Sequence, residues 1–198
     1  KIQIVRSLFQ EKKPNKVILF SGSKQKVKEI AKVLKRMGLS AGEMHSDLDQ
    51  AQRDFIMREF KNERVDILVA TDIVSRGIDI DDITLVINFD VPYDVEDYVH
   101  RIGRTARAGD SGMAITFVSE NEQYRFAQIE KFLQKEIYKI PVPSELGEAP
   151  DYNPAKPERS NRNFSRKRKP NSNNNPHAKT HKKEFKKKSR TASNDKKQ

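Results

Sequence analysis

Arg101, Arg104 and Arg107 stand three residues apart on one short segment. This spacing directs their guanidinium groups toward a common target. Arginine keeps its charge in proteins and binds phosphate oxygens in a bidentate manner, and an arginine at a nucleotide γ-phosphate accelerates phosphoryl transfer. The pattern therefore predicts a phosphate-binding surface. Taken alone, it is more typical of a surface helix turn with solvated arginines, so the other motifs decide between the two.

Four more segments place polar residues or glycine where strands are expected to end, at 20–24, 50–53, 70–80 and 86–92. Ligands of open α/β sheets bind at loops that follow the carboxyl ends of strands. These segments contain the other candidate site residues: Ser21, Gly22, Ser23, Gln50, Arg53, Thr71, Asp72, Arg76, Gly77 and Asp79.

The residue types suggest what each segment could bind. The amides and hydroxyls of Ser21, Gly22 and Ser23 could contact a sugar-phosphate backbone. A plain strand-to-helix turn with Ser23 as the helix N-cap is the alternative, and both interpretations are compatible. Gly77 allows close approach of the backbone to a ligand, and the Asp79 carboxylate could accept hydrogen bonds from ribose hydroxyls.

Gln50 and Arg53 form a Gln-x-x-Arg pattern at the start of an expected helix. Alone, this pattern is more typical of a solvated first helical turn than of a site. Thr71 and Asp72 carry more information, because a hydroxyl and a carboxylate there follow directly after a buried strand.

Alternating apolar runs and helical stretches indicate the elements that position these residues. Short β-branched runs separated by segments of helical period are typical of βαβ units and a parallel sheet. Because the runs are apolar on both faces, we predict an α/β fold with a mostly parallel sheet and helices covering both of its faces. Strands are expected near residues 16–20, 41–45, 65–70, 85–89 and 113–118.

Helices are expected at 1–12, 24–37, 49–62, 96–101 and 122–133. Gly38 is a predicted helix stop and Asp49 a predicted N-cap. Three helices have a defined inward face in this prediction. The inward residues are Ile2, Val5, Leu8 and Phe9 in the first helix, Val27, Ile30, Ala31 and Leu34 in the second, and Phe55, Ile56 and Phe60 in the third.

Charge divides the chain into parts. Residues 1–146 contain 23 basic and 23 acidic residues, so the formal net charge of +11 resides entirely in the remainder. We predict a folded domain at 1–140, a Pro-rich linker at 141–159, and a disordered Lys/Arg/Asn-rich tail at 160–198. With no cysteine, no long apolar run and no signal peptide, we expect a cytoplasmic protein that does not enter membranes. The first residue, Lys1, suggests a processed product or a piece of a longer protein.

In order and spacing, these motifs resemble those of the C-terminal RecA-like domain of DEAD-box ATP-dependent RNA helicases. The resemblance covers roughly residues 1–135, and the Arg-Thr-Ala-Arg-Ala sequence with a basic tail resembles the bacterial RhlE-type subgroup. It implies that Arg104 and Arg107 are catalytic and bind the γ-phosphate of ATP. It also assigns Gly77 and Asp79 to the ribose.

The resemblance further implies that Ser21, Gly22, Ser23 and Thr71 bind RNA. It assigns the remaining candidates to a network that couples RNA to nucleotide: Gln50, Arg53, Asp72, Arg76, His100 and Arg101. RNA recognition through phosphates and ribose predicts low sequence specificity. The expected partners are RNA and an N-terminal RecA-like domain of the same protein, and the protein is expected to be a monomer.

Two ATPase motifs do not occur in the sequence. There is no phosphate-binding G-x-x-x-x-G-K-[ST] loop and no Asp-Glu-Ala-Asp box to hold Mg²⁺. We therefore expect no metal site in this chain, no activity of the chain alone, and ATP with Mg²⁺ bound mainly by the N-terminal domain. The alternative function is a non-catalytic RNA-binding or annealing module with a basic tail. A DNA-directed helicase of the same superfamily is disfavoured by the combination of the Gln50-x-x-Arg53 motif with residues 100–107.

Overall fold

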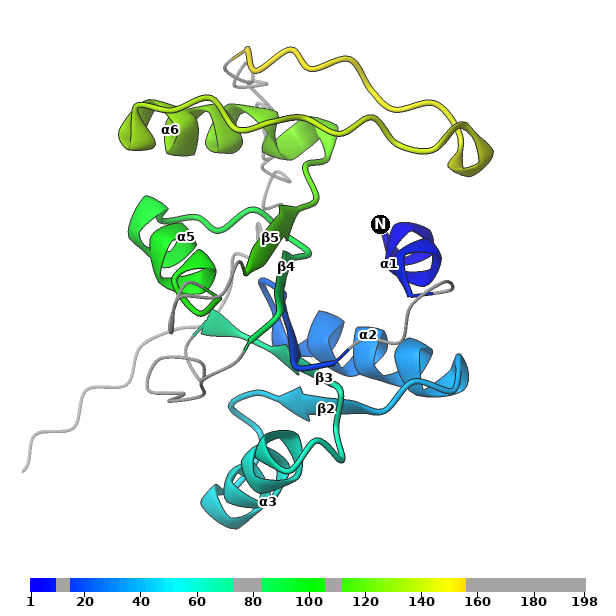
Figure 1. Cartoon of the computed structure of the whole chain (residues 1–198). Helices are drawn as coiled ribbons and strands as arrows, with labels where there is room; N and C mark the ends of the chain where they lie inside the picture. The colour runs from blue at the N-terminus through cyan, green and yellow to red at the C-terminus, as the bar shows by residue number, and fades with distance from the viewer. Residues whose placement is uncertain (10–14, 73–82, 106–111, 156–198) are drawn as a thin grey trace, which may run out of the picture. The chain divides into compact units, whose positions relative to one another are not determined.

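A computed structural model describes residues 1–9, 15–72, 83–105 and 112–155. All of them belong to one compact unit, Lys1–Arg159. Its centre is a five-stranded parallel sheet with the order β2-β3-β1-β4-β5 (Figure 1). The strands are β1 (Val17–Phe20), β2 (Ala41–Met44), β3 (Ile67–Ala70), β4 (Leu85–Asn88) and β5 (Met113–Thr116). The predicted α/β fold with a parallel sheet is confirmed.

Helices cover both faces of this sheet. They are α1 (Ile2–Leu8), α2 (Lys24–Arg36), α3 (Gln50–Lys61), α5 (Val95–Ile102) and α6 (Gln123–Leu133), with short 3-10 turns at Glu120–Glu122 and Ser144–Leu146. Alternate residues of each strand enter different clusters. Val17 and Leu19 pack with α1 and α2 on one face, whereas Ile18 and Phe20 pack with α3 on the other. In Figure 1, α1 and α2 lie beside each other, and α3 lies by the β2 edge.

Local sequence signals set the ends of the helices. Ser23 has extended backbone angles and accepts a hydrogen bond from the Lys26 amide, so it is the N-cap of α2. At the other end of α2, Gly38 adopts a φ of +80°, a left-handed conformation that suits glycine. Asp49 caps α3 in a reciprocal pair with Gln52, a capping box. The predicted N-caps and the glycine stop are confirmed.

Two predictions of inward-facing side chains are wrong. Phe55 is 53% exposed, although Ile56 packs inward and Phe60 is fully buried. Five residues advance an α-helix by about 140° beyond a full turn, so Phe55 and Phe60 cannot share a narrow face. Leu8 is 38% exposed. The inward stripe of α1 runs instead through Ile2, Val5 and Phe9.

A third apolar cluster joins α5 to α6. Val91 and Tyr98 pack there against Phe126 and Ile129 of α6. The end of the described chain returns to the same helix: the side chain of Gln123 donates to the carbonyl of Asp151 (2.7 Å) and accepts from the amide of Asn153 (2.7 Å). These contacts fix residues 151–153, inside the predicted linker, against the first turn of α6.

Among the residues that the structure describes, no helix has both the length and the apolar character needed to cross a membrane.

The two phenylalanines of α3 provide a matched test of the core. Phe60→Ala removes a fully buried ring and should lower the free energy of unfolding by about 3–5 kcal/mol. Phe55→Ala, in the same helix but exposed, should change it by no more than about 0.5 kcal/mol. Urea denaturation of both variants measures the difference, and equal losses would contradict the described orientation of α3.

Candidate functional site

Three strand ends meet at one edge of the sheet. β1 lies between β3 and β4, and Phe20 is in register with both Ala70 and Asn88. The residues that follow, beginning at Ser21, Thr71 and Phe89, therefore leave the sheet side by side. The chain runs from β1 to β2 in one direction and continues through β4 and β5 in the other, and such a reversal of strand order is where open α/β sheets bind ligands.

Arg101 is the most buried charged residue at this edge, with 2% of its surface exposed. Its Nε and Nη2 donate to the two carboxylate oxygens of Asp72 at 2.5 and 2.7 Å. Its Nη1 donates to the side-chain oxygen of Asn88 and to the carbonyl of Asp90, both at 3.0 Å. Planar bidentate geometry is specific to arginine, so lysine could not reproduce this arrangement.

The surroundings of the Arg101 guanidinium compensate for its burial. Its central carbon lies 5.1 Å from the ring centroid of Phe20, the last residue of β1, in a cation-π contact. Asn88 is fully buried and also donates to the Thr116 hydroxyl (3.1 Å). One residue of α5 thus fastens that helix to the ends of β1, β3 and β4, and through Asn88 to β5.

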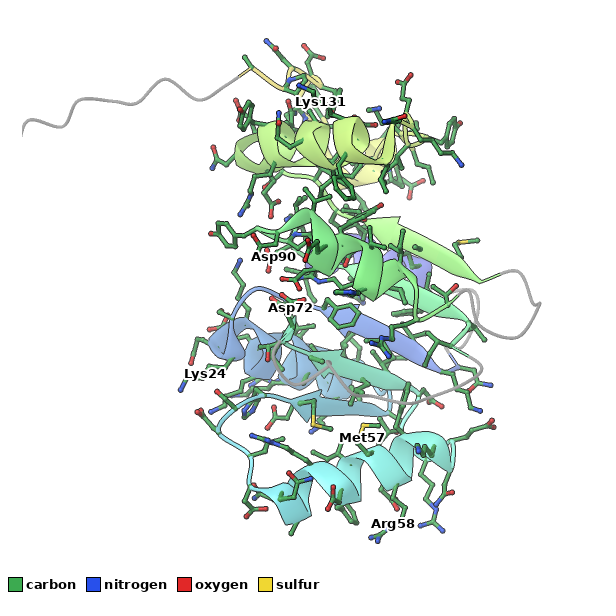
Figure 2. The ribbon with its side chains drawn as sticks, turned by 90° about the vertical axis from the view of Figure 1, so that its left-hand side faces the viewer. Lys24, Met57, Arg58, Asp72, Asp90 and Lys131 are labelled. Atoms are coloured by element: carbon green, nitrogen blue, oxygen red, sulfur yellow. The ribbon has the colours of Figure 1, made fainter. Side chains whose placement is uncertain are left out.

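Asp90 holds the turn that follows β1. It accepts from the Ser21 hydroxyl (2.8 Å), the Gly22 amide (3.1 Å) and the Lys26 ammonium (2.9 Å). Burial raises the pKa of Asp90, but the hydrogen bonds from these three groups outweigh it and hold the pKa at about 2. The turn is therefore positioned by a carboxylate that stays ionised. Figure 2 shows Asp72 and Asp90 on the same side of the molecule as Lys24.

A second carboxylate extends this network to the first residue. Glu122 accepts from the Val91 amide (3.1 Å) and from the Lys1 ammonium (2.5 Å). Lys1 also donates to the Phe89 carbonyl (2.8 Å) and lies 3.7 Å from Asp90. Although burial opposes it, hydrogen bonds from Lys1 and Ser119 lower the pKa of Glu122. Glu122 and Lys1 thus both hold the loop after β4, and they also bind each other.

The candidates around this network differ in exposure. Ser21 is buried with its hydroxyl directed to Asp90, whereas Ser23 is exposed and Thr71 is half-buried. His100 is exposed, because it precedes the buried Arg101 by one residue on the helix. Arg104 is half-buried in the turn that ends α5, and its amide donates to the Arg101 carbonyl (3.1 Å).

Gln50 and Arg53 lie on the first turns of α3. Gln50 is exposed and donates to Asp54 (2.8 Å), and Arg53 donates to the carbonyl of Ser46 (3.4 Å) in the turn before the helix. Within the described ranges, the Arg53 Nε and the His45 Nε2 are buried and have no hydrogen-bond partner. Unsatisfied buried groups are rare in folded proteins and call for an explanation.

Four predicted site residues, Arg76, Gly77, Asp79 and Arg107, lie outside the described residues. The described part of the chain holds no group of three His, Cys, Asp or Glu residues that could bind a metal ion.

Sequence reasoning assigned no role to Asn88, Asp90 or Lys26, which the structure places at the centre of the network. The sequence contains a usable signal for Asn88 and Asp90. Asn88 interrupts an apolar strand, and Asp90 follows it closely, so both are polar residues where burial is expected. Buried polar groups need partners, and here the partners are Arg101 and the turn after β1.

Comparison with known families identifies the class of this domain. The model of the helicase conserved C-terminal domain family matches residues 1–109, more than half of the chain. The chain therefore belongs to that family, and its parallel sheet is the RecA-like fold of these domains.

Relatives define the subfamily more closely. The DEAD-box ATP-dependent RNA helicase CshA of Geobacillus kaustophilus (strain HTA426) is 42% identical over 144 residues, which is 73% of this chain. The CshA of Bacillus subtilis (strain 168) is 41% identical over the same length. This chain is the C-terminal helicase domain of a DEAD-box protein.

Solved structures agree with this assignment. The E. coli DEAD-box protein SrmB, bound to regulator of ribonuclease activity A, superposes with a TM-score of 0.70 and 33% identity, covering 76% of this chain and 89% of that one. Domain 2 of the DEAD-box helicase Mss116p, bound to an RNA duplex, gives a TM-score of 0.64 at 27% identity, covering 73% and 59%. By contrast, the chain spans only about three tenths of the length of the CshA proteins.

The role of Asp90 can be tested by Asp90→Asn. The amide would place a donor against the Ser21, Gly22 and Lys26 donors, so we expect the free energy of unfolding at neutral pH to fall by about 1–3 kcal/mol. Asp47→Asn is the matched control, because Asp47 pairs with two lysines at the surface. Its denaturation midpoint should stay unchanged. A loss in the control as large as that in Asp90→Asn would contradict the role of burial.

The low pKa of Asp90 also predicts a pH dependence. A carboxylate with a folded pKa of about 2 and an ordinary value of 3.8 stabilises the fold above pH 4, and this stabilisation disappears as the pH falls toward 2. The difference in unfolding free energy between the native chain and Asp90→Asn should therefore shrink from pH 6 to pH 2. Urea titrations at a series of pH values measure it, and a constant difference would show that Asp90 has an ordinary pKa.

Proposed function

We propose that this chain is the C-terminal half of an ATP-dependent RNA helicase that separates short RNA duplexes locally. The observation that carries the proposal is the clamp of Arg101 on Asp72, Asn88 and Asp90. It fixes α5 against the sheet edge, and Arg104 follows Arg101 by about one turn, half-buried where α5 ends. Membership of the DEAD-box family supports the same function.

RNA would bind at the loops after β1 and β3. Gly22, Ser23 and Thr71 would contact the sugar-phosphate backbone, and Ser21 would position the turn through its bond to Asp90. Contacts of this kind carry little base information, so we expect low sequence specificity.

ATP would bind between this domain and an N-terminal RecA-like domain. Transfer of its terminal phosphoryl group to water would drive the helicase cycle. Arg104 and Arg107 would neutralise charge on the γ-phosphate, with Gly77 and Asp79 at the ribose. The N-terminal domain would hold Mg²⁺.

The ionic network would couple the two ligands. The carboxylate of Asp90 accepts a hydrogen bond from the turn after β1, and its carbonyl accepts one from Arg101. Movement of the RNA-facing turn would therefore be transmitted to α5, and movement of α5 to the turn. Arg53, Gln50, Arg76 and His100 would complete the coupling when the domains close.

The basic tail would add RNA affinity of a different kind. Residues 160–198 form the Lys/Arg/Asn-rich segment, joined to the domain by 141–159. A polycation that neutralises phosphates releases counterions, so its contribution should fall steeply with salt. We retain the RhlE-type assignment as a proposal, although the curated relatives named above are CshA proteins. A cytoplasmic monomer remains the expected form.

The arginine assignment is tested in a protein that carries an N-terminal RecA-like domain before this chain. Arg104→Ala should reduce RNA-stimulated ATP hydrolysis by about a thousandfold or more, because an arginine at the γ-phosphate contributes this much to phosphoryl transfer. Binding of RNA without nucleotide should be largely retained.

Arg58→Ala is the matched control, since Arg58 is exposed on α3 and Figure 2 shows it far from Asp72 and Asp90. This variant should keep normal turnover. Full activity of Arg104→Ala would refute the catalytic role. Loss of nucleotide-free RNA binding in Arg104→Ala would place Arg104 in the RNA site instead. ATP hydrolysis by the native chain without an N-terminal domain would support neither the catalytic nor the RNA-binding role.

A further inference from the structure

Tyr93 is an aromatic residue exposed at the rim of the candidate site. It lies in the loop between β4 and α5, three residues after Asp90, and 84% of its surface is accessible. An exposed tyrosine presents a large, rigid, amphipathic ring that a ligand can cover. The proposed roles of the neighbouring residues leave Tyr93 unexplained.

The ring of Tyr93 is held in place by Arg125 of α6. The guanidinium carbon lies 4.1 Å from the ring centroid, a close cation-π stack. Arg125 is in turn fixed by an ion pair with Glu122 (3.7 Å), the carboxylate that anchors the same loop through the Val91 amide. One face of the ring is therefore covered by arginine, while the high exposure of the residue leaves the opposite face accessible.

This arrangement fits a flat, neutral group better than a phosphate. The nearby carboxylates of Asp90 and Glu122 are paired with Lys26 and Lys1, but Asp94, the next residue after Tyr93, is exposed and would repel an anion. A nucleobase is flat and uncharged, and base stacking on an exposed aromatic side chain is sequence-tolerant. The loop also belongs to the edge where the RNA backbone is proposed to bind.

We propose that Tyr93, backed by Arg125, is a stacking platform for one unpaired nucleobase of the bound RNA strand. This inference rests on the proposed function, because it assumes that RNA lies along the sheet edge. It adds a contact with a base to a surface otherwise expected to read only the backbone. The preference that results is for single-stranded over fully paired RNA at this position.

The absence of tryptophan from the sequence makes a direct test possible. In the full chain, Tyr93→Trp introduces a unique fluorophore, and Tyr138→Trp is the matched control because Tyr138 is also 84% exposed. Titration with an oligouridine should quench the indole fluorescence of the Tyr93→Trp variant and leave that of the Tyr138→Trp variant unchanged. A same-length oligonucleotide with abasic riboses should quench neither variant. Equal quenching of the two variants, or no quenching of Tyr93→Trp while RNA binds, would overturn the platform.

Affinity provides the second readout. At raised salt, where the tail contributes less, Tyr93→Ala should weaken binding of oligouridine by about fivefold or more. It should leave binding of the abasic strand unchanged. Tyr93→Phe should bind within about twofold of the native chain because it keeps the ring, and Tyr138→Ala should match the native chain.

The outcomes separate this inference from the proposed function. Normal RNA binding by Tyr93→Ala would overturn the stacking platform but leave the helicase proposal intact. Failure of the native chain to bind any RNA would overturn both.

Discussion

The buried ion pair between Arg101 and Asp72 is the interaction on which the rest of the site depends. Arg101 is 2% exposed, and a charge so deeply buried is tolerated only when it is paired and hydrogen-bonded. Here one guanidinium binds Asp72, Asn88 and the Asp90 carbonyl and stacks on Phe20. The same contacts that offset desolvation also join the ends of β1, β3 and β4 to α5, so the geometry of the edge and the stability of the domain have a common origin.

A parallel sheet makes this convergence possible. Because β1 is flanked by β3 and β4 in register, three loops that are distant in sequence leave the sheet together. Two carboxylates then hold the loops: Asp90 fixes the turn after β1, and Glu122 fixes the loop after β4. Polar groups at this edge are therefore divided between residues used internally, such as Ser21, and residues left accessible, such as Ser23 and His100. That division leaves Ser23 and His100 available for the ligand and interdomain contacts that we propose.

The sequence predicted the strands, the principal helices and their caps because these depend on local periodicity and on single side chains such as Asp49. It failed where orientation depends on a rotation of one residue, as with Phe55. At the site, the spacing of the arginines pointed to Arg101, and the position after a buried strand pointed to Asp72, as separate candidates. It could not show that they bind each other, nor that Asp90 supports Ser21 and Gly22, because those contacts span 29 and about 69 residues and exist only once the sheet has formed.

We propose that this domain holds one half of an ATPase site that only a second RecA-like domain completes. The most direct test is RNA-stimulated ATP hydrolysis, measured for this chain alone and for a protein in which an N-terminal RecA-like domain precedes it. We expect no turnover from the chain alone and RNA-dependent turnover from the two-domain protein. ATP hydrolysis by the chain alone, or none by the two-domain protein although RNA binds, would contradict the claim, and the second result would favour a non-catalytic RNA-binding module.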